Sequence, residues 1–341
     1  MKNTEKPTGL TAAQREKWEM VYHFARLISK YEPWQFFRET DHFVYADWKH
    51  ETTVHYRFLA DCMQRCGIAC YFGDRNYDCA TEYLFSNNRK MEPVEHLQNA
   101  LIGLWGNRKD LSKKSYEVVK QLEERGHGDG SWLYFEKYTE GFLPTVPNDE
   151  ELDLLGDALG NLYMMMHALF DRVGSTVFPP NAYFFRWYDP KTEQYYNAFS
   201  PAEKARKVPH YQLKITPTPH TVLISRMPKG SFSVSMDWSY LPFTIRENGR
   251  DFYPILLLAV SQDGIILEQQ AFAPDDPKDQ VFVHVIDDLI KHHGKPRQIR
   301  VSDPDLWCFV EPLCRVVNIK ATKEDRLPVV DRARKVLLEQ L

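Results

Sequence analysis

The order of predicted elements over residues 231–341 constrains the fold of this chain more than any other feature of its sequence. At 231–239, apolar side chains alternate with serines and Asp237, which is typical of a strand. Two apolar runs, 253–261 and 264–272, flank a turn and predict a hairpin. A helix, a strand, a helix, a strand and a final helix follow them. This order predicts an α+β domain with one mixed sheet flanked by helices.

The length of 341 residues is suited to two domains, each able to bury its own core. We place an N-terminal α+β domain at 1–174 and the C-terminal domain at 225–341. The N-terminal domain shows strand patterns typical of an antiparallel sheet, and helices that Thr11 and Asn148 can cap. Between the domains, residues 175–224 are rich in Pro, Tyr and Phe and contain a predicted hairpin. This composition indicates a connector that packs against one or both domains.

The overall charge gives no sign of a nucleic-acid-binding protein. The formal net charge is −4, and the isoelectric point near 6.3 is not basic. The first residues lack the apolar core of a signal peptide, and no apolar run reaches the roughly 20 residues needed to cross a bilayer. We therefore expect a cytoplasmic protein without a membrane partner, in which nucleic acid could contact only a local patch.

Four of the six cysteines, Cys62, Cys66, Cys70 and Cys79, lie close together in the sequence. None of their spacings is the tight pair of a zinc knuckle, in which two residues separate the cysteines. We interpret them as reduced, half-buried thiols rather than metal ligands.

Two aspartates of the C-terminal half need an explanation. Asp303 precedes Pro304, and proline is favoured at the first position of a helix, so Asp303 is a good N-cap. Asp237 lies inside a predicted strand, where aspartate is disfavoured. It could pair with Arg246 or Arg250, or it could be a functional carboxylate.

Most of the chain resembles a bacterial two-domain family that consists of paired domains of unknown function. The resemblance covers residues 18–170 and 231–341. It rests on stretches such as IACYFGDRNYDCATEYL, YTEGFLPTVPNDEELDLL and HHGKPRQIRVSDPDLWCFVEPL. It implies a bacterial protein of two domains and implies no catalytic residue.

The C-terminal half also resembles ribonuclease H-like domains of the integrase and transposase type, in element order and in the stretches VSMDWSYLPF, YPILLLAVSQDGIIL and HHGKPRQIRVSD. The resemblance implies that Asp237 and Asp303 bind a divalent metal together with a third acid. The glutamate-bearing helix of those enzymes is absent, so Asp331, or alternatively Glu339, would complete the site. Magnesium or manganese would activate water for phosphodiester cleavage, and this requires that the carboxylates converge within about 6 Å.

A basic stretch, 291–300, lies beside Asp303. Lys295, Arg297 and Arg300 in this stretch could receive a phosphate, although such charge runs usually form a solvated face.

Two functions follow, and the sequence leaves open whether the chain is an enzyme. The first is a non-catalytic binding or regulatory protein with a nuclease-like C-terminal fold and a protein partner. Its N-terminal domain would bind through exposed aromatic residues near Trp34 or Trp187. The alternative is a magnesium- or manganese-dependent phosphodiesterase that uses Asp237 and Asp303.

Overall fold

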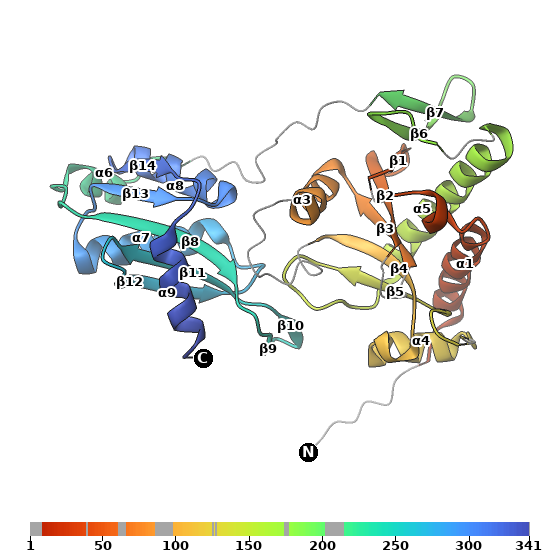
Figure 1. The fold of residues 1–341 in the computed structure, drawn as a ribbon, viewed down its shortest axis with the longest axis horizontal. Helices are drawn as coiled ribbons and strands as arrows, with labels where there is room; N and C mark the ends of the chain where they lie inside the picture. Colours follow the sequence, from red (N-terminus) through yellow and green to blue (C-terminus); the bar gives the residue numbers. More distant parts are fainter. Residues whose placement is uncertain are drawn as a thin grey trace, which may run out of the picture. The chain divides into compact units, whose positions relative to one another are not determined.

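The structure is a computed structural model that describes residues 9–38, 40–60, 66–85, 98–124, 126, 128–173, 177–201 and 215–340. The chain divides into two compact units. The first is built from the described residues up to 201, apart from Gly141–Leu143, which belong to the second unit together with residues from 215 onward. Each unit has its own sheet and its own hydrophobic core (Figure 1).

The first unit contains a seven-stranded sheet in the order β5-β4-β3-β2-β1-β6-β7. Its strands are β1 (His42–Asp47), β2 (Thr52–Ala60), β3 (Cys66–Phe72), β4 (Ala100–Gly106), β5 (Trp132–Tyr138), β6 (Ala182–Asp189) and β7 (Gln194–Pro201). Neighbouring strands are antiparallel except β1 and β6, which are parallel. The expectation of an antiparallel sheet is therefore wrong for this pair. A long crossover connects β1 to β6, and parallel neighbours require such a connection.

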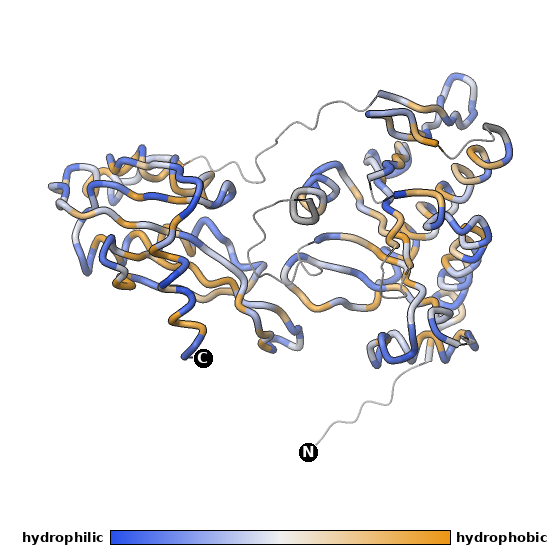
Figure 2. Tube along the Cα trace, in the orientation of Figure 1, coloured by the Kyte–Doolittle hydropathy of each residue, from blue (hydrophilic) through white to orange (hydrophobic). Residues whose placement is uncertain are grey.

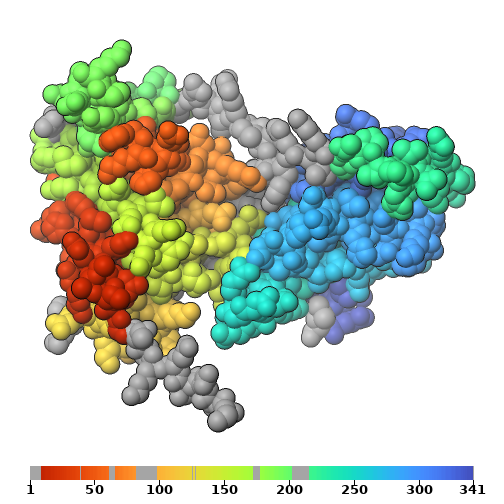
Figure 3. Space-filling model, turned by 180° about the vertical axis from the view of Figure 1, so that it is seen from behind, coloured from red at the N-terminus to blue at the C-terminus, as the bar shows by residue number. Residues whose placement is uncertain are grey.

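Helices cover both faces of this sheet. One face packs on α1 (Ala12–Ser29) and α5 (Asp149–His167), which lie side by side (Figure 3). Thr11 caps α1 and Asn148 caps α5, each in a capping box, as the sequence predicts. The other face packs on α3 (Asp74–Phe85) and α4 (Lys113–Gln121). Short helical turns are α2 (Pro33–Phe36), η2 (Arg108–Asp110) and η3 (Ala168–Val173).

The hairpin that the sequence analysis assigns to the connector is part of the first sheet. Strands β6 and β7 pair with each other, and β6 pairs with β1 in the register His42↔Tyr183 and Val44↔Phe185. Phe184, between these two residues, points to the opposite face and joins the core beneath α1 and α5. The aromatic residues of this stretch are therefore strand residues with two different environments.

The second unit contains a five-stranded sheet in the order β12-β11-β8-β13-β14. Its strands are β8 (Ser233–Tyr240), β11 (Ile255–Ser261), β12 (Ile266–Phe272), β13 (Gln298–Val301) and β14 (Lys320–Lys323), and a separate ribbon is formed by β9 (Ile245–Glu247) and β10 (Arg250–Phe252). Strand β11 is antiparallel to both of its neighbours, β12 and β8, whereas β8, β13 and β14 are mutually parallel. The prediction that the first three of these strands share one mixed sheet is confirmed.

The two faces of β8 have different partners. Val234 and Met236 belong to the core formed with α7 (Lys278–His293) and α8 (Pro304–Val316), and α6 (Pro219–Arg226) contacts α8. The opposite face packs on α9 (Pro328–Leu338), whose Val330 and Ala333 contact apolar residues of β11. Apolar residues, orange in Figure 2, follow the strands that the helices cover. Because side chains alternate along a strand, the serines of β8 and Asp237 face α9.

No helix within the described ranges combines the length and the apolar character that a membrane span requires.

Candidate functional site

Asp237 is the buried acid of the second sheet. Its residue is only 2% exposed, and its Oδ2 accepts a hydrogen bond from Nη2 of Arg334 at 2.8 Å. Arg334 is itself half-buried on α9, with 14% of its side chain exposed. Arg246 and Arg250, the partners expected from the sequence, do not pair with Asp237, so this expectation is wrong. Arg246 pairs with Asp251 and Arg250 with Asp275 on the surface.

The two candidates for a third acid lie at different distances from this pair. Asp331 precedes Arg334 by one helical turn, and its Oδ1 lies 3.5 Å from Nη1 of the same guanidinium. Glu339 ends α9 and faces Lys335 at 4.0 Å. Asp237 and Asp331 therefore converge on Arg334, and Glu339 does not take part. We call Asp237, Arg334 and Asp331 the carboxylate cluster.

Asp303 caps α8. Its Oδ1 accepts hydrogen bonds from the backbone N–H groups of Asp305 at 2.9 Å and Leu306 at 2.8 Å. These are two of the N–H groups that a helix leaves without an internal partner. The capping interpretation of Asp303 is confirmed.

The metal-site hypothesis requires carboxylates that turn toward a shared ion. Instead, Asp303 directs an oxygen at the backbone of α8, while Asp237 directs one at a guanidinium. Over the ranges that the structure describes, no three His, Cys, Asp or Glu side chains are grouped as a metal ion would need. This includes Cys66, Cys70 and Cys79, which are free thiols; Cys62 lies outside the described residues. Burial raises the pKa of the Cys66 thiol to about 11, so it is a poor nucleophile at neutral pH.

The three candidate phosphate ligands do not form one surface. Lys295 is 2% exposed, and its Nζ donates to the carbonyl oxygens of Ile224, Ser225 and Met227 at the end of α6. Arg297 is exposed, whereas Arg300 is half-buried on β13 beside Ser235. Residues 297 and 300 differ in strand parity and point to opposite faces of the sheet. Lys295 is thus a structural cation that binds a helix C-terminus.

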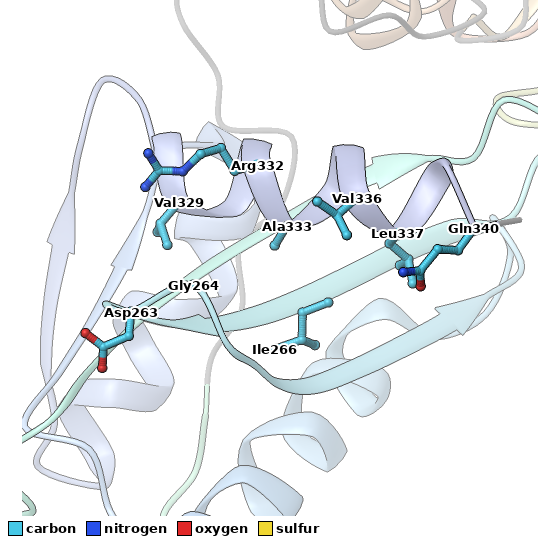
Figure 4. A pocket seen from close by; sticks show the side chains of 9 residues that line it. All are labelled: Asp263, Gly264, Ile266, Val329, Arg332, Ala333, Val336, Leu337 and Gln340. Carbon is cyan, nitrogen blue, oxygen red and sulfur yellow. The ribbon is translucent and has the colours of Figure 1, made fainter.

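A groove of about 360 Å³ lies on the other flank of α9 (Figure 4). Val329, Val336 and Leu337 of α9 and Ile266 of β12 give it an apolar lining. Asp263 and Arg332 also line it. The carboxylate cluster does not open into this groove, since neither Asp237 nor Arg334 is among its lining residues.

The first sheet carries a polar cluster that the sequence analysis does not identify. Nε2 of His42 lies 2.8 Å from Nδ1 of His55, and Nε2 of His55 lies 2.8 Å from Oδ1 of Asp74, which also accepts a 2.5 Å bond from Oγ1 of Thr53. We call His42, His55 and Asp74 the histidine relay. A sequence signal exists, because the β1–β2 hairpin places His55 opposite Val44, two residues from His42 and on the same face of the sheet. Asp74 comes from α3, so its position could not be read from the hairpin.

Burial determines the protonation state of the two histidines in the relay. It lowers the pKa of His42 to about 3, with contributions from His55 and Arg57, while Asp74 opposes the change. Burial also lowers the pKa of His55, and the hydrogen bond and charge of Asp74 oppose this shift. The bonds from Thr53 and His55 lower the pKa of Asp74. At neutral pH, therefore, the relay consists of two neutral imidazoles and one carboxylate.

Two family models match the chain, one over most of the first sheet and one over the second. Residues 18–185 match the model "Domain of unknown function (DUF7309)", and residues 223–338 match "Domain of unknown function (DUF6930)". No curated protein matches the chain.

Among solved structures, the chain is similar to the catalytic core domain of the HTLV-2 integrase in complex with magnesium (trimeric form), at 14% identity and a TM-score of 0.25. The match covers 33% of this chain and 71% of that one. It is also similar to a simian T-cell lymphotropic virus intasome in complex with the PP2A regulatory subunit B56 gamma, at 15% identity and a TM-score of 0.25. That match covers 33% of this chain and 43% of the other. The chain thus contains two domains of unknown function, and a third of it distantly resembles an integrase core.

Proposed function

We propose that the second unit is a non-catalytic binding or regulatory module that keeps a nuclease-like fold. The observation that carries this proposal is the position of Arg334. Its guanidinium lies against Asp237, the strand carboxylate that would hold a metal in a ribonuclease H-like enzyme, and against Asp331, the candidate third acid.

The chemistry of the guanidinium supports this interpretation. Arginine stays charged at every physiological pH and cannot leave the site as a metal ion can. Its bond to Asp237 places a positive charge beside a carboxylate that is costly to bury. A magnesium ion would have to displace this bonded cation before it could bind Asp237 with oxygen ligands alone.

The position of Asp303 points the same way. A metal ligand needs a carboxylate oxygen to bind the ion, and a cap needs one for the helix N–H groups. Oδ1 of Asp303 already accepts two backbone hydrogen bonds. Because Lys295, Arg297 and Arg300 do not share a surface, we propose a protein rather than a nucleic acid as the partner of this unit.

Cleavage of labelled single-stranded and double-stranded DNA and RNA tests the proposal, with magnesium or manganese added. We expect no cleavage above background from the wild type or from Asp237→Asn. Asp275→Asn, which removes one partner of the surface pair with Arg250, is the matched control. Equal weak cleavage in all three preparations would indicate a contaminating nuclease and agree with the proposal.

The alternative is the metal-dependent phosphodiesterase. Cleavage by the wild type and by Asp275→Asn that disappears in a folded Asp237→Asn variant would establish that alternative and overturn our proposal. Circular dichroism of each variant separates loss of activity from loss of fold.

A further inference from the structure

The face of the first sheet that carries the histidine relay also carries a row of aromatic rings. On β6, Tyr183 pairs in register with His42 and Phe185 with Val44, and Trp187 is the next residue on the same face. Tyr196 of β7 lies opposite Trp187. We propose that this face binds a nucleobase, which stacks on the aromatic row and donates an N–H hydrogen bond to Nδ1 of His42. All of these residues belong to the first unit, so the inference is independent of the function proposed for the second.

The direction of the hydrogen bonds in the relay determines which imidazole nitrogen has no partner within the relay. An ionised Asp74 can only accept, so Nε2 of His55 carries the proton and donates to it. In a neutral imidazole the other nitrogen is then an acceptor, and Nδ1 of His55 must receive the proton of His42 Nε2. Nδ1 of His42 therefore carries a lone pair. Among the described residues, none donates a hydrogen bond to it.

The relay holds His42 as an acceptor rather than as a cation. A neutral imidazole is maintained because the ring is largely buried and because His55 and Arg57 disfavour a positive charge. Tyr77 fixes the ring, since it stacks on His42 with centroids 4.2 Å apart and planes inclined by 3°. The relay thus presents a fixed hydrogen-bond acceptor at neutral pH.

The aromatic row continues from this acceptor along the strand. The ring of Tyr183 lies 5.8 Å from that of His42 and 5.7 Å from Phe185. Phe185 and Trp187 are stacked at 5.4 Å, as are Trp187 and Tyr196 at 5.6 Å. The first three rings are half-buried, and Tyr196 is 36% exposed. Water therefore reaches parts of a contiguous aromatic surface.

A nucleobase fits this combination of groups. It is planar, it stacks on exposed aromatic side chains, and its amino and ring N–H groups are donors for a lone pair. The base could belong to a free nucleoside or to single-stranded nucleic acid. The described face shows no cluster of cations for a phosphate chain, so base recognition is the shared chemistry of both sources.

Fluorescence titration of the full chain tests the proposal, because Trp187 belongs to the row. Adenosine, guanosine, cytidine and uridine are titrated separately, with purine riboside as the matched ligand that stacks like adenosine but has no N–H donor. We expect saturable quenching by at least one nucleoside. For adenosine, we expect purine riboside to bind about tenfold more weakly, since one hydrogen bond is lost.

Two variants locate the binding. His42→Phe keeps a ring on Tyr77 but removes the lone pair, and Trp187→Leu removes part of the stacking surface; each should weaken binding by about tenfold. Equilibrium dialysis measures binding to both variants, because Trp187→Leu lacks the fluorophore of the row. Phe36→Leu is the matched control, because Phe36 is 50% exposed and contacts Phe170 away from the row. A single-stranded 12-mer distinguishes the sources. Binding per base that exceeds that of the nucleoside identifies a strand, and equal binding identifies a free base.

The ¹⁵N resonance of His42 Nδ1 provides a readout that does not depend on variants. Bound nucleoside should move this resonance, because the lone pair becomes a hydrogen-bond acceptor. If no nucleoside and no 12-mer binds, or if binding leaves the resonance in place and persists in both His42→Phe and Trp187→Leu, the proposal fails.

Discussion

The carboxylate cluster of the second sheet and the histidine relay of the first sheet both bond an aspartate to nitrogen groups. These groups belong to a charged guanidinium in the cluster and to a neutral imidazole in the relay. Each places an aspartate beside nitrogen donors on a sheet face. Asp237 is 2% exposed and faces a guanidinium on α9, so its charge is compensated inside the cluster. Asp74 has 74% of its side chain exposed and is connected to His42 by hydrogen bonds through the neutral imidazole of His55.

The carboxylate cluster and the histidine relay differ in the groups that they leave available to a ligand. Arg334 joins two acids into a cluster whose charges face one another, so an added metal would have to break existing bonds. The relay ends in an acceptor nitrogen to which no described residue donates a hydrogen bond. In the carboxylate cluster, both acids already face a cation, whereas Nδ1 of His42 accepts no hydrogen bond from the described residues.

Replacing Arg334 by Met should lower the free energy of unfolding of the second unit by about 3–5 kcal/mol, because Asp237 would remain buried without its cation. Urea-dependent hydrogen exchange of β8 and β11 peptides measures this change. The double variant Asp237→Asn/Arg334→Met should recover most of the loss. A small effect of Arg334→Met alone would mean that the cluster is not closed.

Acid should destabilise the first unit through the relay. The pKa of His42 is lowered from 6.5 to about 3 in the folded state, so the unfolded chain binds more protons between these values. The stability that neutral His42 provides is present above pH 6.5 and is lost as the pH falls, on the order of 3 kcal/mol by pH 4. Six of the eight tryptophans lie in the first unit, so fluorescence reports its unfolding. His42→Phe should flatten this pH dependence; an unchanged slope would contradict the relay.

Lys295→Met should destabilise the second unit by about 1–3 kcal/mol, because the carbonyl groups at the end of α6 would lose their buried donor. Hydrogen exchange of the α6 peptide measures the loss. Lys229→Met is the control, since Lys229 is exposed and bonds only to Asn318 among the described residues. If both variants behaved alike, Lys295 would have no special structural role.

Asp303→Ala should cost about 1 kcal/mol, the usual value for loss of a helix N-cap. Faster exchange should be confined to the first turn of α8, where the N–H groups of Asp305 and Leu306 lose their acceptor. Asp325→Ala, at an exposed loop position, is the control. An effect as large as that of Arg334→Met would point to a role beyond capping.

Local patterns predicted the elements that local interactions determine. The strand alternation at 231–239, the hairpin after it and the cap at Asp303 all depend on residues close in sequence, and each is present in the structure. The same holds for Thr11 and Asn148, whose capping boxes span only four residues. Even Asp237 could be recognised as unusual, because a charged residue inside a strand needs a partner.

Long-range pairing could not be predicted in the same way. Arg334 reaches Asp237 only because α9 packs across β8, 97 residues away in sequence. Strand β6 joins β1 through a crossover, and this pairing aligns Tyr183 with His42. No periodicity in a single sequence indicates which helix covers which strand. The members of both clusters could therefore be identified only from the tertiary structure.

We propose that the guanidinium of Arg334 takes the place of a metal ion beside Asp237 of the second sheet. Electron paramagnetic resonance of manganese tests it directly, because free manganese gives a strong signal that is lost on binding. With equimolar protein and manganese, we expect the signal of the free ion to persist for the wild type and to be the same for Asp237→Asn. Stoichiometric loss of the signal with the wild type, restored by Asp237→Asn, would contradict the account.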